Sequence, residues 1–176
     1  MNGYLIQDIA GAGRPAAARV EWGLWYQHYF QSERGRAGLA ANRRDITRIL
    51  WENNSPTWTF DDATFERSAE AFDNPDFVDV VIHSYRHRMG LADGFARYRD
   101  IECRLSTLPP ITVPTITLDG DADGVVAATD GTSSAMRFGG RRIHRIVEGI
   151  GHNLPQEAPG PFATAVLDLL AATTPT

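Results

Sequence analysis

Apolar side chains recur every three or four residues along most of the chain before residue 108. This spacing gathers them on one face of a helix. Residues 16–31 follow it with aromatic side chains, so this stretch is expected to form one helix that buries an aromatic stripe. The stripe comprises Trp22, Trp25, Tyr26, Tyr29 and Phe30. Further helices are expected over residues 39–51, 62–72, 75–88 and 95–108, with a break at the glycines of residues 35–38.

Local signals mark the start of two of these helices. Asp61 precedes an acidic first turn and is expected to cap the helix over residues 62–72. Pro75 suits the first turn of the next helix, because proline lacks a backbone N–H that would be unpaired there. One face of that helix is expected to carry Phe77, Val80, Val81, Ser84, Tyr85 and Arg88. Tyr85 should therefore point in the same direction as apolar neighbours.

The pattern changes after the pair Pro109-Pro110. Two β-rich runs, Val113–Leu118 and Arg142–Val147, predict strands, of which the first is expected to be buried, with a short helix between them over residues 132–138. A closing helix over Pro161–Ala171 is expected to bury Phe162, Ala165, Val166, Leu169 and Leu170. The alternation of strands and helices predicts parallel strands. Two parallel strands cannot cover their own faces and edges, so either further strands come from elsewhere or the chain is incomplete.

Acidic and imidazole side chains follow the two predicted strands. Asp119, Asp121 and Asp123 come after the first strand, and His152, between glycine and asparagine, comes after the second. Ligands of open α/β sheets bind beyond the carboxyl ends of the strands, where both groups are delivered. We therefore expect an Asp/His pair to form the chemical site.

Charge and composition exclude two classes of partner. The formal net charge is −5, and all 17 basic residues are arginines with no dominant basic block. A nucleic-acid or anionic-membrane surface would need such a block.

The single cysteine, Cys103, excludes an intramolecular disulfide, and the amino terminus lacks the basic region of a signal peptide. No apolar run approaches the roughly eighteen residues of a membrane span, so a soluble, cytoplasmic protein is expected.

Two short motifs resemble the carboxyl-terminal third of the α/β-hydrolase fold. Gly120–Asp123 matches the family's GxxD, which carries the triad acid, and Gly149–His152 matches its GxGH, which carries the triad histidine. The resemblance implies that Asp123 is the orienting acid and His152 the base. It also implies that the early helices form the family's cap.

The resemblance implies a fold class and a division of the chain. The fold is expected to be α/β: an incomplete α/β-hydrolase fold, with a helical cap followed by a truncated parallel sheet and flanking helices. The expected segments are a residual core strand or loop over residues 1–14, the cap over residues 15–108, and the carboxyl-terminal part of the core over residues 109–176.

Two stretches of the expected cap resemble epoxide hydrolases. Residues 25–31 are similar to the first cap-tyrosine segment of that family, and residues 83–87 to the second. By position, the resemblance implies that Tyr26 and Tyr85 hydrogen-bond the oxygen of a small apolar substrate such as an epoxide. The family's chemistry requires no metal or cofactor.

The sequence departs from the family in one respect. The family's nucleophile stands in a GxSxG or GxDxG turn between a strand and a helix, and no such turn precedes the cap. Residues 131–135 come nearest to it but follow the acid, so we reject them. The chain alone is therefore expected to be inactive. The sequence does not show whether the missing nucleophile is Asp or Ser. Haloalkane dehalogenase and carboxylesterase activity, the latter of which would need Ser, therefore stay open as alternatives.

Other interpretations use the same residues. Residues 119–124 match the first half of an EF-hand calcium loop, although a strand rather than a helix leads into it. His83 and His87 have the spacing of two zinc ligands on a helix, but a structural or solvent-facing role is favoured. Finally, the chain could be a non-catalytic fragment or the partner-binding half of a split hydrolase, which associates through an exposed sheet edge.

Overall fold

The computed structural model describes residues 4–173, which group into two compact units. Unit 1 comprises the residues up to Leu5, residues 51–58 and the residues from Pro109 on, and unit 2 comprises residues 6–50 and 59–108. Residues 51–58, which fall inside the expected cap segment, thus group with the strands. The outermost residues of the expected segments 1–14 and 109–176, namely 1–3 and 174–176, lie outside the described residues.

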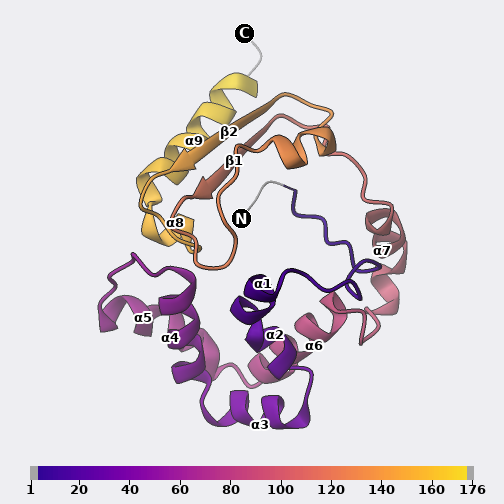
Figure 1. Cartoon of the computed structure of the whole chain (residues 1–176), viewed down its shortest axis with the longest axis vertical. Helices are drawn as coiled ribbons and strands as arrows, with labels where there is room; N and C mark the ends of the chain where they lie inside the picture. The colour runs from indigo at the N-terminus through magenta and orange to yellow at the C-terminus, as the bar shows by residue number, and fades with distance from the viewer. Residues whose placement is uncertain (1–3, 174–176) are drawn as a thin grey trace. The chain divides into compact units, whose positions relative to one another are not determined.

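Unit 2 is helical (Figure 1). Its helices are α1 (Ala18–Gly23), α2 (Trp25–Tyr29), α3 (Glu33–Ala41), α4 (Arg43–Asn54, whose last turn counts with unit 1), α5 (Asp62–Ala69), α6 (Phe77–Arg88) and α7 (Arg99–Ser106), with 3₁₀ turns at Glu70–Asp73 and Ala96–Tyr98. The buried centre consists of Tyr26, Phe30, Leu39, Ile46 and Ile82. None of the helices in residues 4–173 has the length and apolar character needed to cross a membrane.

The aromatic stretch forms two helices, so the prediction of one helix over residues 16–31 is wrong. The chain leaves helical geometry at Leu24, where φ is −96° and ψ is 18°. Because of this break the stripe is only partly buried: Tyr26 and Phe30 lie inside, whereas Trp22 is 66% exposed. The hydrophobic spacing indicated which side chains could share a face, but not that the helix would stop between them.

The glycines of residues 35–38 do not break a helix, contrary to prediction, because α3 continues through them. Ser32 caps its start, since its Oγ accepts a hydrogen bond of 3.0 Å from the Gly35 amide. A Cβ on Gly35 would overlap the Tyr29 carbonyl, and one on Gly38 would overlap the Tyr29 hydroxyl. These glycines therefore allow α3 to lie close against Tyr29.

The start of α5 follows its local signal, but that of α6 does not: α6 begins at Phe77, so Pro75 lies in the turn before the helix and not in its first turn. Asp61 caps α5, as predicted, by accepting a 2.7 Å hydrogen bond from the Thr64 amide. On α6, Phe77, Val81 and Tyr85 pack against the buried centre. Val80, expected on the same face, is instead 63% exposed.

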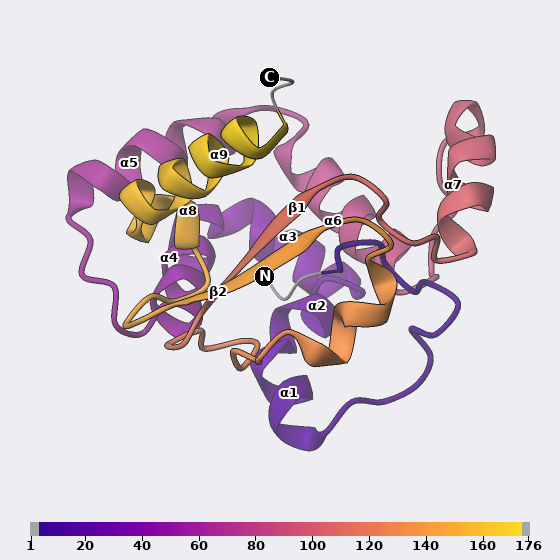
Figure 2. The ribbon, with the colours of Figure 1, turned by 90° about the horizontal axis from the view of Figure 1, so that it is seen from above.

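Unit 1 contains two parallel strands, β1 (Thr115–Gly120) and β2 (Arg142–Val147), which are paired from Thr115 with Arg142 to Gly120 with Val147. The bounds of β2 are those predicted, whereas β1 begins and ends two residues later than expected. A 3₁₀ helix (Thr132–Arg137) joins the strands, and α8 (Leu154–Glu157) and α9 (Pro159–Thr173) follow them. Helix α9 lies along the two strands (Figures 1 and 2).

The prediction that α9 buries a full apolar face is only partly right. Ala165 is buried, but Phe162, Val166 and Leu170 are 42%, 45% and 58% exposed. The apolar positions of α9 thus have the spacing of a buried helix face, but the described residues leave part of that face exposed.

Candidate active site

The loop after β1 places Asp123 in a buried position with both carboxylate oxygens hydrogen-bonded. Oδ1 accepts from the amides of Val125 and Val126, at 2.8 and 3.0 Å, and Oδ2 lies 2.8 Å from Nδ1 of His152. The Asp123 side chain is 2% exposed and that of His152 is 27% exposed. The acid is thus enclosed, while the imidazole retains a route to solvent.

The hydrogen bonds decide the ionisation of Asp123. Burial raises its pKa, but the hydrogen bonds from His152, Val126 and Val125 together outweigh burial and hold the pKa below its usual value. The carboxyl group is therefore ionised at neutral pH. Because the folded pKa is lowered, its contribution to stability is present above the unfolded pKa of about 3.9 and is lost as the pH falls through the folded pKa.

The ionised carboxylate sets the tautomer of His152. A carboxylate only accepts hydrogen bonds, so Nδ1 of the imidazole must carry the proton that it shares with Asp123. Nε2 of the neutral ring then has a free lone pair. A lone pair on Nε2 with an anion behind Nδ1 is the arrangement of a general base.

The carboxylates of Asp119, within β1, and of Asp121 and Asp123, after it, bind separate partners. Asp119 is 1% exposed, accepts from the Thr129 amide at 3.2 Å and lies 3.9 Å from Nε2 of His144. Asp121 accepts from the Gly149 amide at 2.6 Å. A calcium loop needs such carboxylates to converge on one point. Their engagement with different partners argues against the EF-hand interpretation.

The two expected cap tyrosines meet within unit 2. Tyr26 lies on α2 and Tyr85 on α6, with ring centroids 5.5 Å apart in an edge-to-face arrangement. Nε2 of Gln27 lies 3.5 Å from the Tyr26 hydroxyl, and the Arg88 guanidinium stands 5.6 Å from the centroid of the Tyr85 ring. Burial, followed by the proximity of Tyr26, raises the pKa of Tyr85 to about 12. Tyr85 is therefore a phenol that stays protonated and able to donate.

Removing the Tyr26 hydroxyl should shift this titration. In Tyr26→Phe the pKa of Tyr85 is expected to fall below about 12 but to stay above the ordinary value of about 10, because burial, the larger cause, is kept. NMR of ¹³C-labelled tyrosine between pH 8 and 13, assigned with Tyr85→Phe, measures it. An unchanged Tyr85 titration would show that the two phenols do not interact.

His87 is held by other groups, and the His83 ring packs against those of His87 and Phe95. The two imidazole rings stack at 6.1 Å between centroids. Nδ1 of His87 lies 3.1 Å from the Ala92 carbonyl oxygen, and its Nε2 lies 3.5 Å from the Glu102 carboxylate. These contacts fit a structural role rather than a shared zinc ion.

Sequence reasoning missed the groups that hold the loop of His152. Asn54 and Ser55 accept hydrogen bonds from the amide of His152 itself, and Glu157 accepts from the amides of Gly151 and Asn153 on either side of it. Glu157 stands five residues after His152, and that proximity was a usable signal. Ser55 is 97 positions away, and nothing in the local sequence connects it to the histidine.

Comparison with solved structures places these features in a family. No protein-family model matches the chain. A candidate epoxide hydrolase of Klebsiella pneumoniae is 44% identical with a TM-score of 0.91, and the match covers 96% of this chain and 56% of that one. The chain belongs to the epoxide hydrolase-like α/β hydrolases. It spans just over half the length of the Klebsiella structure.

Two more distant structures share the fold of this epoxide hydrolase-like chain. Cfl2 of Burkholderia cenocepacia is 16% identical with a TM-score of 0.66, over 89% of this chain and 51% of its own. The epoxide hydrolase CorEH is 15% identical with a TM-score of 0.69, over 93% of this chain and 55% of its own. The expected fold class, an α/β-hydrolase fold present in part with a truncated parallel sheet, is confirmed.

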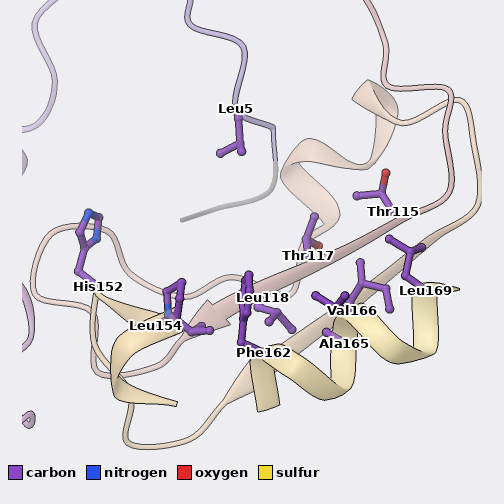
Figure 3. Close-up of a pocket in the computed structure, with 12 residues that line it drawn as sticks. Leu5, Thr115, Thr117, Leu118, His152, Leu154, Phe162, Ala165, Val166 and Leu169 are labelled. Atoms are coloured by element: carbon purple, nitrogen blue, oxygen red, sulfur yellow. The ribbon is translucent and has the colours of Figure 1, made fainter. Parts of the chain in front are cut away.

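An apolar groove runs along the hydrolase sheet in unit 1. It has a volume of about 330 Å³ and lies between one side of β1 and helix α9, with Leu5 across from them and His152 at one end (Figure 3). Among the described residues β1 pairs with a strand on one edge only. The groove therefore combines an open strand edge with the exposed apolar side chains of α9.

Proposed function

We propose that this chain supplies the cap and the acid/base pair of an epoxide hydrolase. The observation that carries the proposal is the 2.8 Å hydrogen bond between Nδ1 of His152 and Oδ2 of Asp123, made in loops that follow two adjacent parallel strands. In this proposal His152 is the general base, Asp123 orients it, and Tyr26 and Tyr85 bind the epoxide oxygen of a small apolar substrate.

The pair would act in the second half of the reaction. A carboxylate nucleophile attacks an epoxide carbon, the carbon–oxygen bond breaks, and an ester with an alkoxide results. The alkoxide takes a proton from a tyrosine. His152 Nε2 then removes a proton from water as the water attacks the ester carbonyl, the ester bond breaks, and the diol leaves with regeneration of the carboxylate. The proton on the imidazolium returns to the tyrosinate, which restores both groups. Asp123 stabilises the imidazolium that forms.

The tyrosines suit the first half of this reaction. A buried phenol whose pKa is raised remains a neutral donor at the pH at which the ring opens. Two donors on one oxygen would stabilise the negative charge that develops there. A pair of phenols favours epoxide opening over haloalkane dehalogenation or carboxyl-ester hydrolysis, which release a different leaving group.

The proposal assigns the nucleophile to residues outside these 176. No strand–turn–helix motif of the GxSxG or GxDxG type stands before the cap, and the chain spans 56% of its Klebsiella relative. We therefore expect no turnover from the chain alone.

Complementation tests this assignment. The chain would be co-expressed with the part of the Klebsiella pneumoniae relative that it does not match, and styrene oxide hydrolysis measured by diol formation. Diol is expected from the mixture but from neither part alone. A mixture that hydrolyses p-nitrophenyl acetate and leaves styrene oxide intact would favour the carboxylesterase alternative. Turnover of styrene oxide by the chain alone, lost in His152→Ala, would overturn the assignment of the nucleophile.

The groove favours a second function, binding of a nucleophile-bearing polypeptide. The edge of β1 that is open among the described residues and the exposed side chains of Phe162 and Val166 form a surface on which another strand and its flanking element could pack. Size-exclusion chromatography of the same mixture is expected to give a one-to-one complex. If the complex forms and opens no epoxide, the chain is a non-catalytic binding half.

A further inference from the structure

The loop that presents His152 is fastened by its backbone. The amide of Gly151 donates to Oε2 of Glu157 at 2.7 Å, and the amide of Asn153 donates to Oε1 of Glu157 at 2.8 Å. The amide of His152 itself donates to Oγ of Ser55 at 3.0 Å. Three consecutive amides centred on the imidazole are thus held by two side chains.

Ser55 and Glu157 also bind each other. The Ser55 hydroxyl donates to Oε1 of Glu157 at 2.6 Å and accepts from the Asn153 amide at 3.2 Å. Ser55 is 1% exposed, so its hydroxyl is sheltered from competing water. Glu157 accepts three hydrogen bonds through its two oxygens, which a carboxylate can do and an amide side chain cannot match.

The backbone packs tightly at this point. A Cβ on Gly151 would lie 2.6 Å from Cα of Ser55, so the loop and residues 51–58 are in close contact. The Asn54 carbonyl accepts from the Gly124 amide at 2.9 Å and from the His152 amide at 3.2 Å. Gly124 directly follows Asp123. One carbonyl therefore joins the loop of the acid to the loop of the base.

We propose that Ser55 and Glu157 are positioning residues, which hold the His152 backbone where its Nδ1 meets Asp123. This inference rests on the proposed function for the catalytic role of Asp123 and His152. The position of the His152 loop can nevertheless be tested without measuring turnover. The contacts of Ser55 are with the His152 and Asn153 amides and with Glu157, so it acts through the backbone rather than on substrate. Its removal would leave Asp123 and the imidazole chemically intact but no longer held together.

NMR of the chain itself tests the proposal. The readout is the low-field proton signal of His152 Nδ1–H, identified by its loss in Asp123→Asn, together with hydrogen exchange of the amides of residues 151–153. In Ser55→Ala and in Glu157→Gln the low-field signal is expected to broaden or disappear. In Ser55→Ala the amides of His152 and Asn153 are expected to exchange roughly tenfold faster or more, because they lose the Ser55 hydroxyl as acceptor. In Glu157→Gln the same is expected of the Gly151 amide, because the amide side chain offers a single acceptor oxygen. Ser55→Thr, which keeps the hydroxyl, is expected to restore both readouts.

Thr57→Ala is the matched control. Its hydroxyl donates at 2.8 Å to the Gly149 carbonyl, so the substitution removes a hydroxyl from the same segment that binds the same loop away from the histidine. The low-field signal should survive in this variant. The proposal is overturned if Thr57→Ala loses the signal as Ser55→Ala does, or if Ser55→Ala and Glu157→Gln retain it. It is also overturned if both variants lose protection throughout β1 and β2, since the network would then support the whole unit.

These outcomes are distinct from failure of the proposed function. A complemented enzyme without epoxide activity leaves the low-field signal in place, because the Asp123–His152 contact lies within the chain. Loss of the signal in Ser55→Ala, with its rescue in Ser55→Thr, would still establish the positioning role.

Discussion

In the complemented enzyme, His152→Ala is expected to lower steady-state diol formation from styrene oxide by about 10³- to 10⁴-fold, the scale of general-base catalysis and of a disabled triad. The imidazole would act on the water that cleaves the ester, not on ring opening. The first step should therefore proceed once, and a covalent ester should accumulate. Intact-protein mass spectrometry would detect it as one added substrate on the nucleophile-bearing polypeptide.

Two further variants make this prediction specific. Asp123→Asn keeps the size of the side chain but replaces the ionised carboxylate by a neutral amide. The Nδ1–H tautomer of His152 is then no longer favoured, because the amide can also donate to Nδ1. A loss of similar size is expected. His28→Ala is the control, because His28 is a half-exposed histidine paired with Glu21 at 2.9 Å. Equal activity of His152→Ala and His28→Ala would refute the base assignment.

Gly120→Ala is expected to destabilise unit 1 by about 3 kcal/mol, at the upper end of overpacking substitutions. Gly120 is the last residue of β1, and a Cβ there would overlap the carbonyl of Ile150 and lie 2.7 Å from the carbonyl oxygen of Gly151. Both obstacles are backbone, which cannot rotate aside. The loop that carries His152 would have to move away from the end of β1. In a chain of this size the loss corresponds to a drop in Tm of roughly 6 to 12 °C.

The control for this substitution is Gly160→Ala in α9. A Cβ on Gly160 meets no atom within 4 Å, so alanine there adds no clash and improves helix propensity. Thermal unfolding followed by circular dichroism would compare the two variants. Similar melting of both would mean that the backbone contact at Gly120 relaxes at little cost.

The sequence allowed the two strands and the proximity of Asp123 to His152 to be predicted because the signals are local. A β-rich run gave β2 its bounds, and short glycine motifs indicated Asp123 and His152 just beyond the strands. The order of the elements then brought the two loops to one edge of the sheet. Each of these steps depends on neighbouring residues alone.

Other features depend on contacts between distant residues, which a local pattern does not contain. Gly35 and Gly38 were interpreted as a helix break, but their role is set by Tyr29 packing against them. The exposed side of α9 has the periodicity of a buried face, because periodicity marks apolar positions and not the presence of a cover. Ser55 reaches the histidine across 97 positions.

The shared acceptor between the loops of Asp123 and His152 is a main-chain oxygen, that of Asn54. Every amino acid offers the same oxygen, so this bridge is indifferent to the identity of residue 54. Related proteins could exchange that residue freely and keep the connection, and substitution scans would record the site as neutral. Its importance would emerge only from a change to the backbone, such as an inserted residue that turns the carbonyl away.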